Sequence, residues 1–314
     1  MIYRKLIKFG DSSFVISLPK EWIEKNVLKK GDVIGIEIGS KNELYVIPKS
    51  KPDREPTEIK IDLDKIDSPE GIRTSIISAY LRNFDIIKIT GSNLIDHSQN
   101  IRNYIHDLAS VEIMEQDHTK ITARCFFNST NISIYSLIRR LDIMTRSMLN
   151  DAKASIKSDN LLDYAYQKET DVTRLTFLIL RTLRKSLNEP ELASALKLQA
   201  VTILEYWQLV DFLEDIADHA KRVCKHLARG PVPDKEKLEK LFDVLIEHYE
   251  NAMKAYYTDN KELAWKVLHL RTNIMNESKD YVEKYRDPVV ISIIEKMRRI
   301  GSNNASIGRI TIDR

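Results

Sequence analysis

The spacing of hydrophobic positions changes along the chain and divides it into three segments. In residues 1–48, apolar and polar positions alternate in short runs, which is typical of β-strands. Residues 57–128 mix such runs with longer stretches in which apolar residues recur every three or four positions. From residue 131 to the end the helical spacing persists. The pattern therefore predicts a small β domain, an α+β module and an all-α domain.

Glycine and proline mark the elements of the first segment. Gly10-Asp11-Ser12 and Gly39-Ser-Lys-Asn42 each separate two alternating runs, as hairpin turns do. The expected elements are strands Arg4–Phe9, Ser13–Leu18, Val33–Ile38 and Glu43–Ile47, and a short helix over Pro19–Asn26. Fewer than fifty residues in short strands make a marginal core. We therefore expect this domain to complete its core as a homodimer.

Residues 49–56 are polar, hold two prolines and read as a linker. The module after them has the predicted order βαβαββ. Its expected elements are Thr57–Leu63, Glu70–Arg82, Asp85–Thr90, Leu94–Leu108, Val111–Glu115 and Ile121–Phe127.

The third segment contains two sets of three predicted helices, separated at Gly230-Pro-Val-Pro233. The expected helices are Ile134–Ile156, Ser158–Leu187, Glu189–Leu227, Lys235–Tyr257, Asn260–Lys284 and one from Pro288 onward. This symmetry predicts an internal duplication, with repeat one at 131–230 and repeat two at 233–314.

One predicted helix, around Leu213–Arg222, carries acids at spacings that place them on one side. Glu214 and Asp218 are four residues apart, and such pairs repel unless a positive charge lies between them. Two interpretations remain open. The face is solvated and balanced by Lys221 and Arg222, or it binds a cation.

The composition limits the class of protein to which the chain can belong. The 314 residues are 43% hydrophobic and 30% charged, with a formal net charge of +3, as in ordinary soluble proteins. Two widely spaced cysteines, Cys125 and Cys224, fit free thiols in a reducing compartment. The sequence has no apolar leader, no run long enough to span a membrane and no GxGxxG or GxxxxGK[ST] motif. These features predict a cytoplasmic protein without a nucleotide site of those kinds.

Basic residues gather on and beside the first hairpin: Arg4, Lys5, Lys8 and Lys20. A two-stranded ribbon with such side chains enters a major groove and contacts phosphates. The alternative is a mildly basic β domain without a nucleic-acid partner.

The stretch Arg4-Lys-Leu-Ile-Lys-Phe-Gly-Asp-Ser-Ser-Phe-Val-Ile-Ser-Leu-Pro-Lys-Glu-Trp, followed by Leu28-Lys-Lys-Gly-Asp-Val-Ile, resembles the SpoVT/AbrB-type (MazE-like) family. Its members are dimers of swapped hairpins that bind DNA. The resemblance implies that Arg4, Lys5, Lys8 and Lys20 face DNA, with Ser12 and Ser13 near phosphate.

The helical segment resembles the PhoU family of phosphate-uptake regulators, two tandem three-helix bundles. The resemblance rests on Arg139-Arg-Leu, Met148-Leu-x-Asp-Ala, Glu169–Arg181 and Leu213–Ala220. The whole layout is similar to that of archaeal PhoU-type regulators.

The PhoU resemblance implies one divalent or iron-type metal ion, held by Glu214 and Asp218 with Glu169 or Asp171 nearby. The equivalent positions in repeat two are Arg298 and Ser302, which cannot ligate as carboxylates do. A metal ion is therefore expected in repeat one alone.

Together the two resemblances imply a non-enzymatic transcriptional regulator of phosphate uptake, with DNA, a second copy and phosphate-transporter or sensor-kinase components as partners. One alternative is a metal-dependent enzyme, which needs carboxylates and histidines from several helices around open coordination positions. The other alternative is an antitoxin-like or structural dimer module.

Overall fold

In the computed structural model, Gly10 turns the first hairpin with φ +69, in the left-handed region that favours glycine. Strand β1 (Ile7–Phe9) pairs antiparallel with β2 (Ser13–Val15). Helix α1 (Lys20–Lys25) follows, and β3 (Ile34–Ile38) pairs antiparallel with β4 (Leu44–Pro48). The four strands and the helix are those expected, although β1 and β2 are shorter because their ladder ends at Ile7↔Val15.

The structure describes residues 2–38, 43–48, 55–127, 132–158 and 161–314. The predicted turn at 39–42, most of the linker at 49–56 and the predicted helix start at 159–160 lie outside these ranges. The chain divides into two compact units, Met1–Pro56 and Thr57–Arg314.

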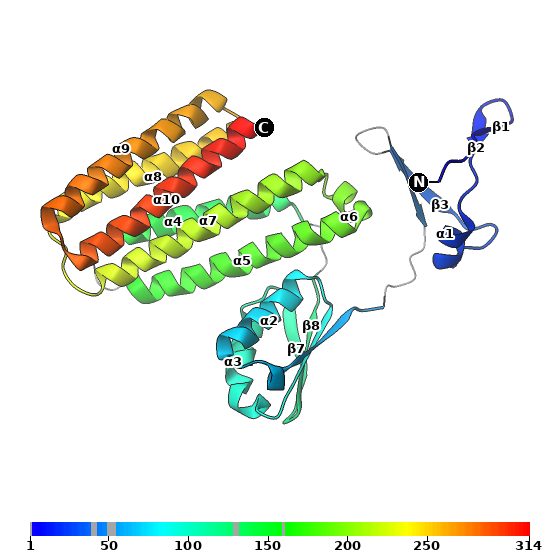
Figure 1. Ribbon diagram of the computed structural model, residues 1–314, viewed down its shortest axis with the longest axis horizontal. Helices are drawn as coiled ribbons and strands as arrows, with labels where there is room; N and C mark the ends of the chain where they lie inside the picture. The colour runs from blue at the N-terminus through cyan, green and yellow to red at the C-terminus, as the bar shows by residue number, and fades with distance from the viewer. Residues whose placement is uncertain (1, 39–42, 49–54, 128–131, 159–160) are drawn as a thin grey trace. The chain divides into compact units, whose positions relative to one another are not determined.

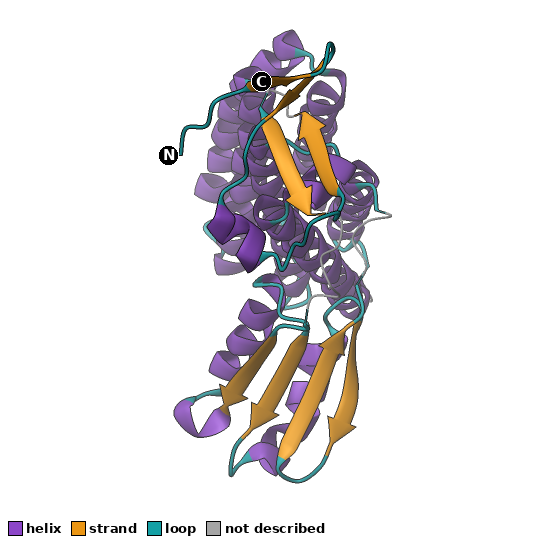
Figure 2. Ribbon diagram, turned by 90° about the vertical axis from the view of Figure 1, so that its right-hand side faces the viewer, coloured by secondary structure: helices purple, strands orange, loops and turns teal. Residues whose placement is uncertain are grey.

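The α+β module begins the second unit and has the predicted βαβαββ order. Its elements are β5 (Glu58–Asp62), η1 (Leu63–Lys65), α2 (Pro69–Leu81), β6 (Ile86–Thr90), α3 (Leu94–His106), β7 (Val111–Gln116) and β8 (Lys120–Cys125). The sheet order is β5-β6-β8-β7, with β5 and β6 parallel and the other neighbours antiparallel. Helices α2 and α3 cover one face of this sheet (Figure 2), and their apolar sides form its core with residues such as Ile76, Ile89 and Ile121.

The helical bundle fills the rest of the second unit (Figure 1). Its helices are α4 (Ile134–Ala154), α5 (Leu162–Asn188), α6 (Pro190–Ala195), α7 (Ala200–Leu227), α8 (Lys235–Thr258), α9 (Lys261–Tyr285) and α10 (Pro288–Asp313). Helices α7 and α10 pack along each other, and α4 packs on α8. The two expected repeats therefore share one continuous apolar core.

One helix prediction is wrong. The expected helix Glu189–Leu227 is two helices, because α6 ends before Lys197, which has φ +55. The N–H of Leu198 bonds the carbonyl of Ala193, and the N–H of Lys197 bonds that of Ser194. These two bonds make a Schellman ending, which closes a helix as glycine usually does.

Candidate DNA-binding hairpin and acidic cluster

The six side chains assigned to DNA are all solvent-exposed: Arg4, Lys5, Lys8, Ser12, Ser13 and Lys20. Lys8 lies on β1, whereas Arg4 and Lys5 precede the strand, which shortens the predicted ribbon. Lys20 opens α1 and lies 3.5 Å from the Glu24 carboxylate, with both side chains exposed. An exposed ion pair of this kind contributes little to stability, so Lys20 can exchange Glu24 for a phosphate at small cost.

The two faces of the first hairpin differ in chemistry. Side chains alternate along a strand, so Ile7 and Phe9 share one face of β1 and Lys8 points to the other. Val15 lies opposite Ile7 and Ser13 opposite Phe9, so this face is mainly apolar, whereas the other face pairs Lys8 with Phe14. These apolar side chains are largely exposed, with Phe9 at 69%. Among the residues of Met1–Pro56 whose burial is described, none is buried, so these residues form no core within a single chain.

The acidic helix α7 is joined to α5 through a lysine. The Nζ of Lys221 lies 2.8 Å from a carboxylate oxygen of Asp218 and 3.2 Å from one of Glu169 on α5. The second oxygen of Asp218 is 2.6 Å from Nε of Arg222. Lys221 and Arg222 thus balance the acids, as one interpretation expected. The cluster is mostly buried instead of solvated, since the Lys221 side chain is 14% exposed.

Burial changes the ionisation of this cluster. Burial, with Asp218 and Glu169 nearby, raises the pKa of Glu214 to about 7. Burial alone would lower the pKa of Lys221, but its hydrogen bonds and attraction to Asp218 and Glu169 outweigh that effect and raise it. Lys221 is therefore a charged ammonium at neutral pH.

The arrangement does not fit the metal ion implied by the resemblance. The carboxylates of Glu169 and Asp218 converge on the Lys221 ammonium, which takes the position of a cation between them. Asp171 is solvent-exposed and two residues from Glu169, so the two side chains leave α5 in different directions. Among the described residues, no three His, Cys, Asp or Glu side chains are grouped as metal ligands.

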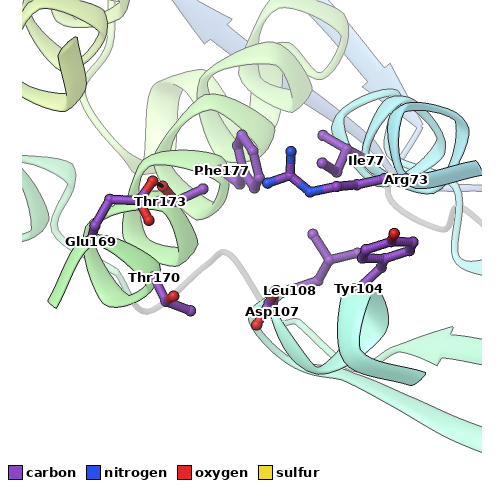
Figure 3. A pocket seen from close by; sticks show the side chains of 9 residues that line it. All are labelled: Arg73, Ile77, Tyr104, Asp107, Leu108, Glu169, Thr170, Thr173 and Phe177. Carbon is purple, nitrogen blue, oxygen red and sulfur yellow. Dashed lines mark hydrogen bonds between the residues drawn. The ribbon is translucent and has the colours of Figure 1, made fainter. Parts of the chain in front are cut away.

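A crevice lies where the α+β module meets α5 (Figure 3). It is lined by Arg73, Ile77, Tyr104, Asp107, Leu108, Glu169, Thr170, Thr173 and Phe177. The Arg73 side chain extends into it from α2. Its volume of about 40 Å³ holds a few water molecules at roughly 10–15 Å³ each. The crevice is therefore too small for a nucleotide or a metabolite of similar size.

Two arginines at this boundary were not singled out from the sequence. Arg73 reaches the crevice, and Arg181 is buried between α5 and the end of α2, where it donates to the carbonyl of Tyr80. The sequence does place Arg181 within the mainly apolar run Leu178–Leu183, and a charged residue in such a run indicates a buried side chain with a specific partner. The pattern could not identify its partner, which is a backbone carbonyl 101 residues away.

The fold joins a hairpin domain that carries exposed basic residues, an α+β module and a helical bundle. Residues 7–54 match the family described as "Antidote-toxin recognition MazE, bacterial antitoxin", and residues 138–227 match the PhoU domain. The chain therefore contains one segment similar to the MazE/AbrB-like domain and one similar to the PhoU domain, the two families that the sequence resembles. The PhoU match falls on repeat one.

The comparisons with curated proteins and with solved structures found little further similarity. No curated protein matches the chain. Among solved structures, the crystal structure of PhoU from Pseudomonas aeruginosa is 15% identical, with a TM-score of 0.43. That similarity covers 57% of this chain and 93% of the other. None of the described helices has the length and apolar character needed to cross a membrane.

Proposed function

We propose that this protein is a cytoplasmic, non-enzymatic transcriptional regulator of phosphate uptake. The N-terminal hairpin domain binds DNA as a homodimer, and the bundle receives a signal or a partner such as a phosphate-transporter or sensor-kinase component. The observation that carries the proposal is the presence, in one chain, of a MazE/AbrB-like domain and a PhoU domain.

The chemistry of the hairpin supports the DNA-binding part. Lys8 and its basic neighbours lie beside an apolar face that has no core of its own. Dimerisation through the apolar face would place two basic ribbons in one particle. Two ribbons would double the phosphate contacts, on which most of the affinity for DNA depends.

Gel shifts over a series of salt concentrations test DNA binding. The Lys5→Glu, Lys8→Glu variant should bind much more weakly than the natural chain. Its affinity should also depend less on salt, by a slope of about 4, because a homodimer would lose two phosphate contacts from each chain. Lys25→Glu, Lys29→Glu, a matched reversal of exposed lysines in the same unit, should retain binding. Equal loss in both variants would count against the assigned face.

Genome-wide occupancy in phosphate-rich and phosphate-starved cells tests the regulatory part. A ligand or partner changes DNA occupancy only through different affinities for two states of the protein. We expect occupancy near phosphate-transport genes that differs between the two conditions. No occupancy there would contradict the proposal even if DNA binding holds.

The MazE match favours a second candidate, an antitoxin-like module. An antitoxin forms a stable complex with a small toxin encoded beside it. Finding no such neighbouring gene, together with sequence-specific binding near transport genes, would exclude this candidate.

A further inference from the structure

We propose that Lys221 is the resident cation of the acidic cluster in repeat one, a tethered ammonium in the place where a metal ion would bind. Its two carboxylate partners, Asp218 and Glu169, are among the four acids that the PhoU resemblance assigned to metal. The cation is supplied by the chain itself, three residues after Asp218 on α7. This inference stands independently of the proposed regulatory function.

The geometry around Nζ carries the proposal. The ammonium has three N–H donors, and two of its neighbours are carboxylate oxygens from different helices, at 2.8 Å on Asp218 and 3.2 Å on Glu169. The ring of Tyr166 on α5 lies 5.7 Å away and adds a cation–π contact. The ammonium therefore has acceptors on both helices that the cluster joins.

A divalent cation and this ammonium cannot share the cluster. Oxygen ligands surround Mg²⁺ or Ca²⁺ at about 2.0–2.6 Å, and the Lys221 nitrogen already lies at hydrogen-bond distance from the same oxygens. The 14% exposure of the lysine side chain leaves it little room to withdraw into solvent. A metal ion would have to displace a buried charge of its own sign.

The other repeat is consistent with a bundle that does not depend on metal. The positions equivalent to Glu214 and Asp218 are Arg298 and Ser302. Repeat two therefore has an arginine at the position of Glu214 and a serine at the position of Asp218, the acid that pairs with Lys221 in repeat one. Repeat two thus lacks this pair of carboxylates, and in repeat one the contact of α5 with α7 through Lys221 should not vary with the supply of metal.

Thermal unfolding of the full chain with Mn²⁺, Zn²⁺ or EDTA tests the inference. The melting temperature of the natural chain should be the same under all three conditions. Lys221→Met leaves the carboxylates without their cation, so this variant should melt lower and should recover by about 5 °C with saturating Mn²⁺. Lys225→Met, at an exposed position one turn further along α7, should behave as the natural chain does.

A double variant locates the metal response. Lys221→Met combined with Asp218→Asn should lose the gain with Mn²⁺, because it removes one of the ligands. A natural chain stabilised by metal would overturn the proposal. So would a Lys221→Met variant that is folded but gains no response to either metal.

If Lys221→Met does not fold, amine labelling of the natural chain measures how accessible Lys221 is. Acetylation followed by mass spectrometry should modify Lys221 much more slowly than the exposed Lys225, and Mn²⁺ should not change either rate. Equal labelling of the two lysines, or faster labelling of Lys221 with Mn²⁺, would overturn the proposal.

Discussion

Arg181 on α5 donates a hydrogen bond to the backbone carbonyl of Tyr80, at the end of α2. Its other terminal nitrogen lies 3.1 Å from the carbonyl oxygen of Phe84, and its guanidinium stacks 4.6 Å from the centre of the Tyr80 ring. The last carbonyls of a helix lack partners within it and carry partial negative charge. A buried arginine thus caps α2 and joins the α+β module to the bundle.

Arg181→Met should destabilise the second unit by about 3 kcal/mol, because it removes two hydrogen bonds from a buried, charged donor. Urea unfolding monitored by circular dichroism measures this loss. Arg184→Met, an exposed position on the same helix, should change stability by less than about 0.5 kcal/mol. A similar effect in both variants would contradict the capping role.

Gly91 is required by close packing after β6. A Cβ atom there would lie 2.6 Å from Cβ of Leu63 and 3.3 Å from its Cα, so the backbone would have to move. Gly91→Ala should therefore lower the free energy of unfolding by about 1–3 kcal/mol. Gly230→Ala is the matched control, since nothing lies within 4 Å of its added carbon. Equal midpoints in a urea titration would show that the module relaxes around the new methyl group.

The apolar face of the first hairpin predicts a dimer that charge can disrupt. Phe9→Asp, Val15→Asp places two carboxylates on that face, and burying them at an interface would be costly. Sedimentation velocity should show a shift from dimer to monomer. The Lys8→Glu variant should remain dimeric and bind DNA more weakly, which separates the two faces. A dimer that survives the aspartates would place the interface elsewhere.

His248 makes stability depend on pH. Burial lowers its pKa, and its ring bonds the carbonyl of Val267 at 2.8 Å and contacts the Asn304 amide at 3.3 Å. The unfolded histidine takes up a proton near pH 6.5, so below that pH the unfolded chain binds more protons than the folded one. Stability should fall as the pH drops below about 6.5, by up to about 1.4 kcal/mol per unit.

Comparison with His248→Gln isolates this contribution. Glu214 acts in the opposite direction: its pKa is raised to about 7, so its stabilising contribution is present at low pH and is lost as the pH rises through 7. Glu214 is unchanged in His248→Gln, so its effect cancels in the difference. The variant should lose less stability than the natural chain between pH 6.5 and 5, whereas His118→Gln at an exposed hairpin tip should not differ. Parallel curves for all three proteins would exclude His248 as the source.

The one wrong helix prediction falls where the sequence gives no clear sign of a turn. The chain turns after α6 at Lys197, a residue with no turn preference, and the bonds of Leu198 and Lys197 to the preceding helix hold that turn. The turn at Gly10, by contrast, is predictable from the sequence, because glycine adopts positive φ readily. Local chemistry predicts a turn only when the residue at the special conformation favours it.

The sequence by itself determined the βαβαββ module, the two sets of three long helices and the resemblance to two families, because hydrophobic period and short motifs are local properties of the chain. It also indicated that Lys221 and Arg222 could balance the acids of α7. Only the tertiary structure showed that Lys221 also pairs with Glu169, since Glu169 lies 52 residues before Lys221 and reaches it through the packing of α5 on α7. The pairing of Arg181 with the end of α2 was decided in the same way. Both depend on distances between helices, which no spacing along the chain contains.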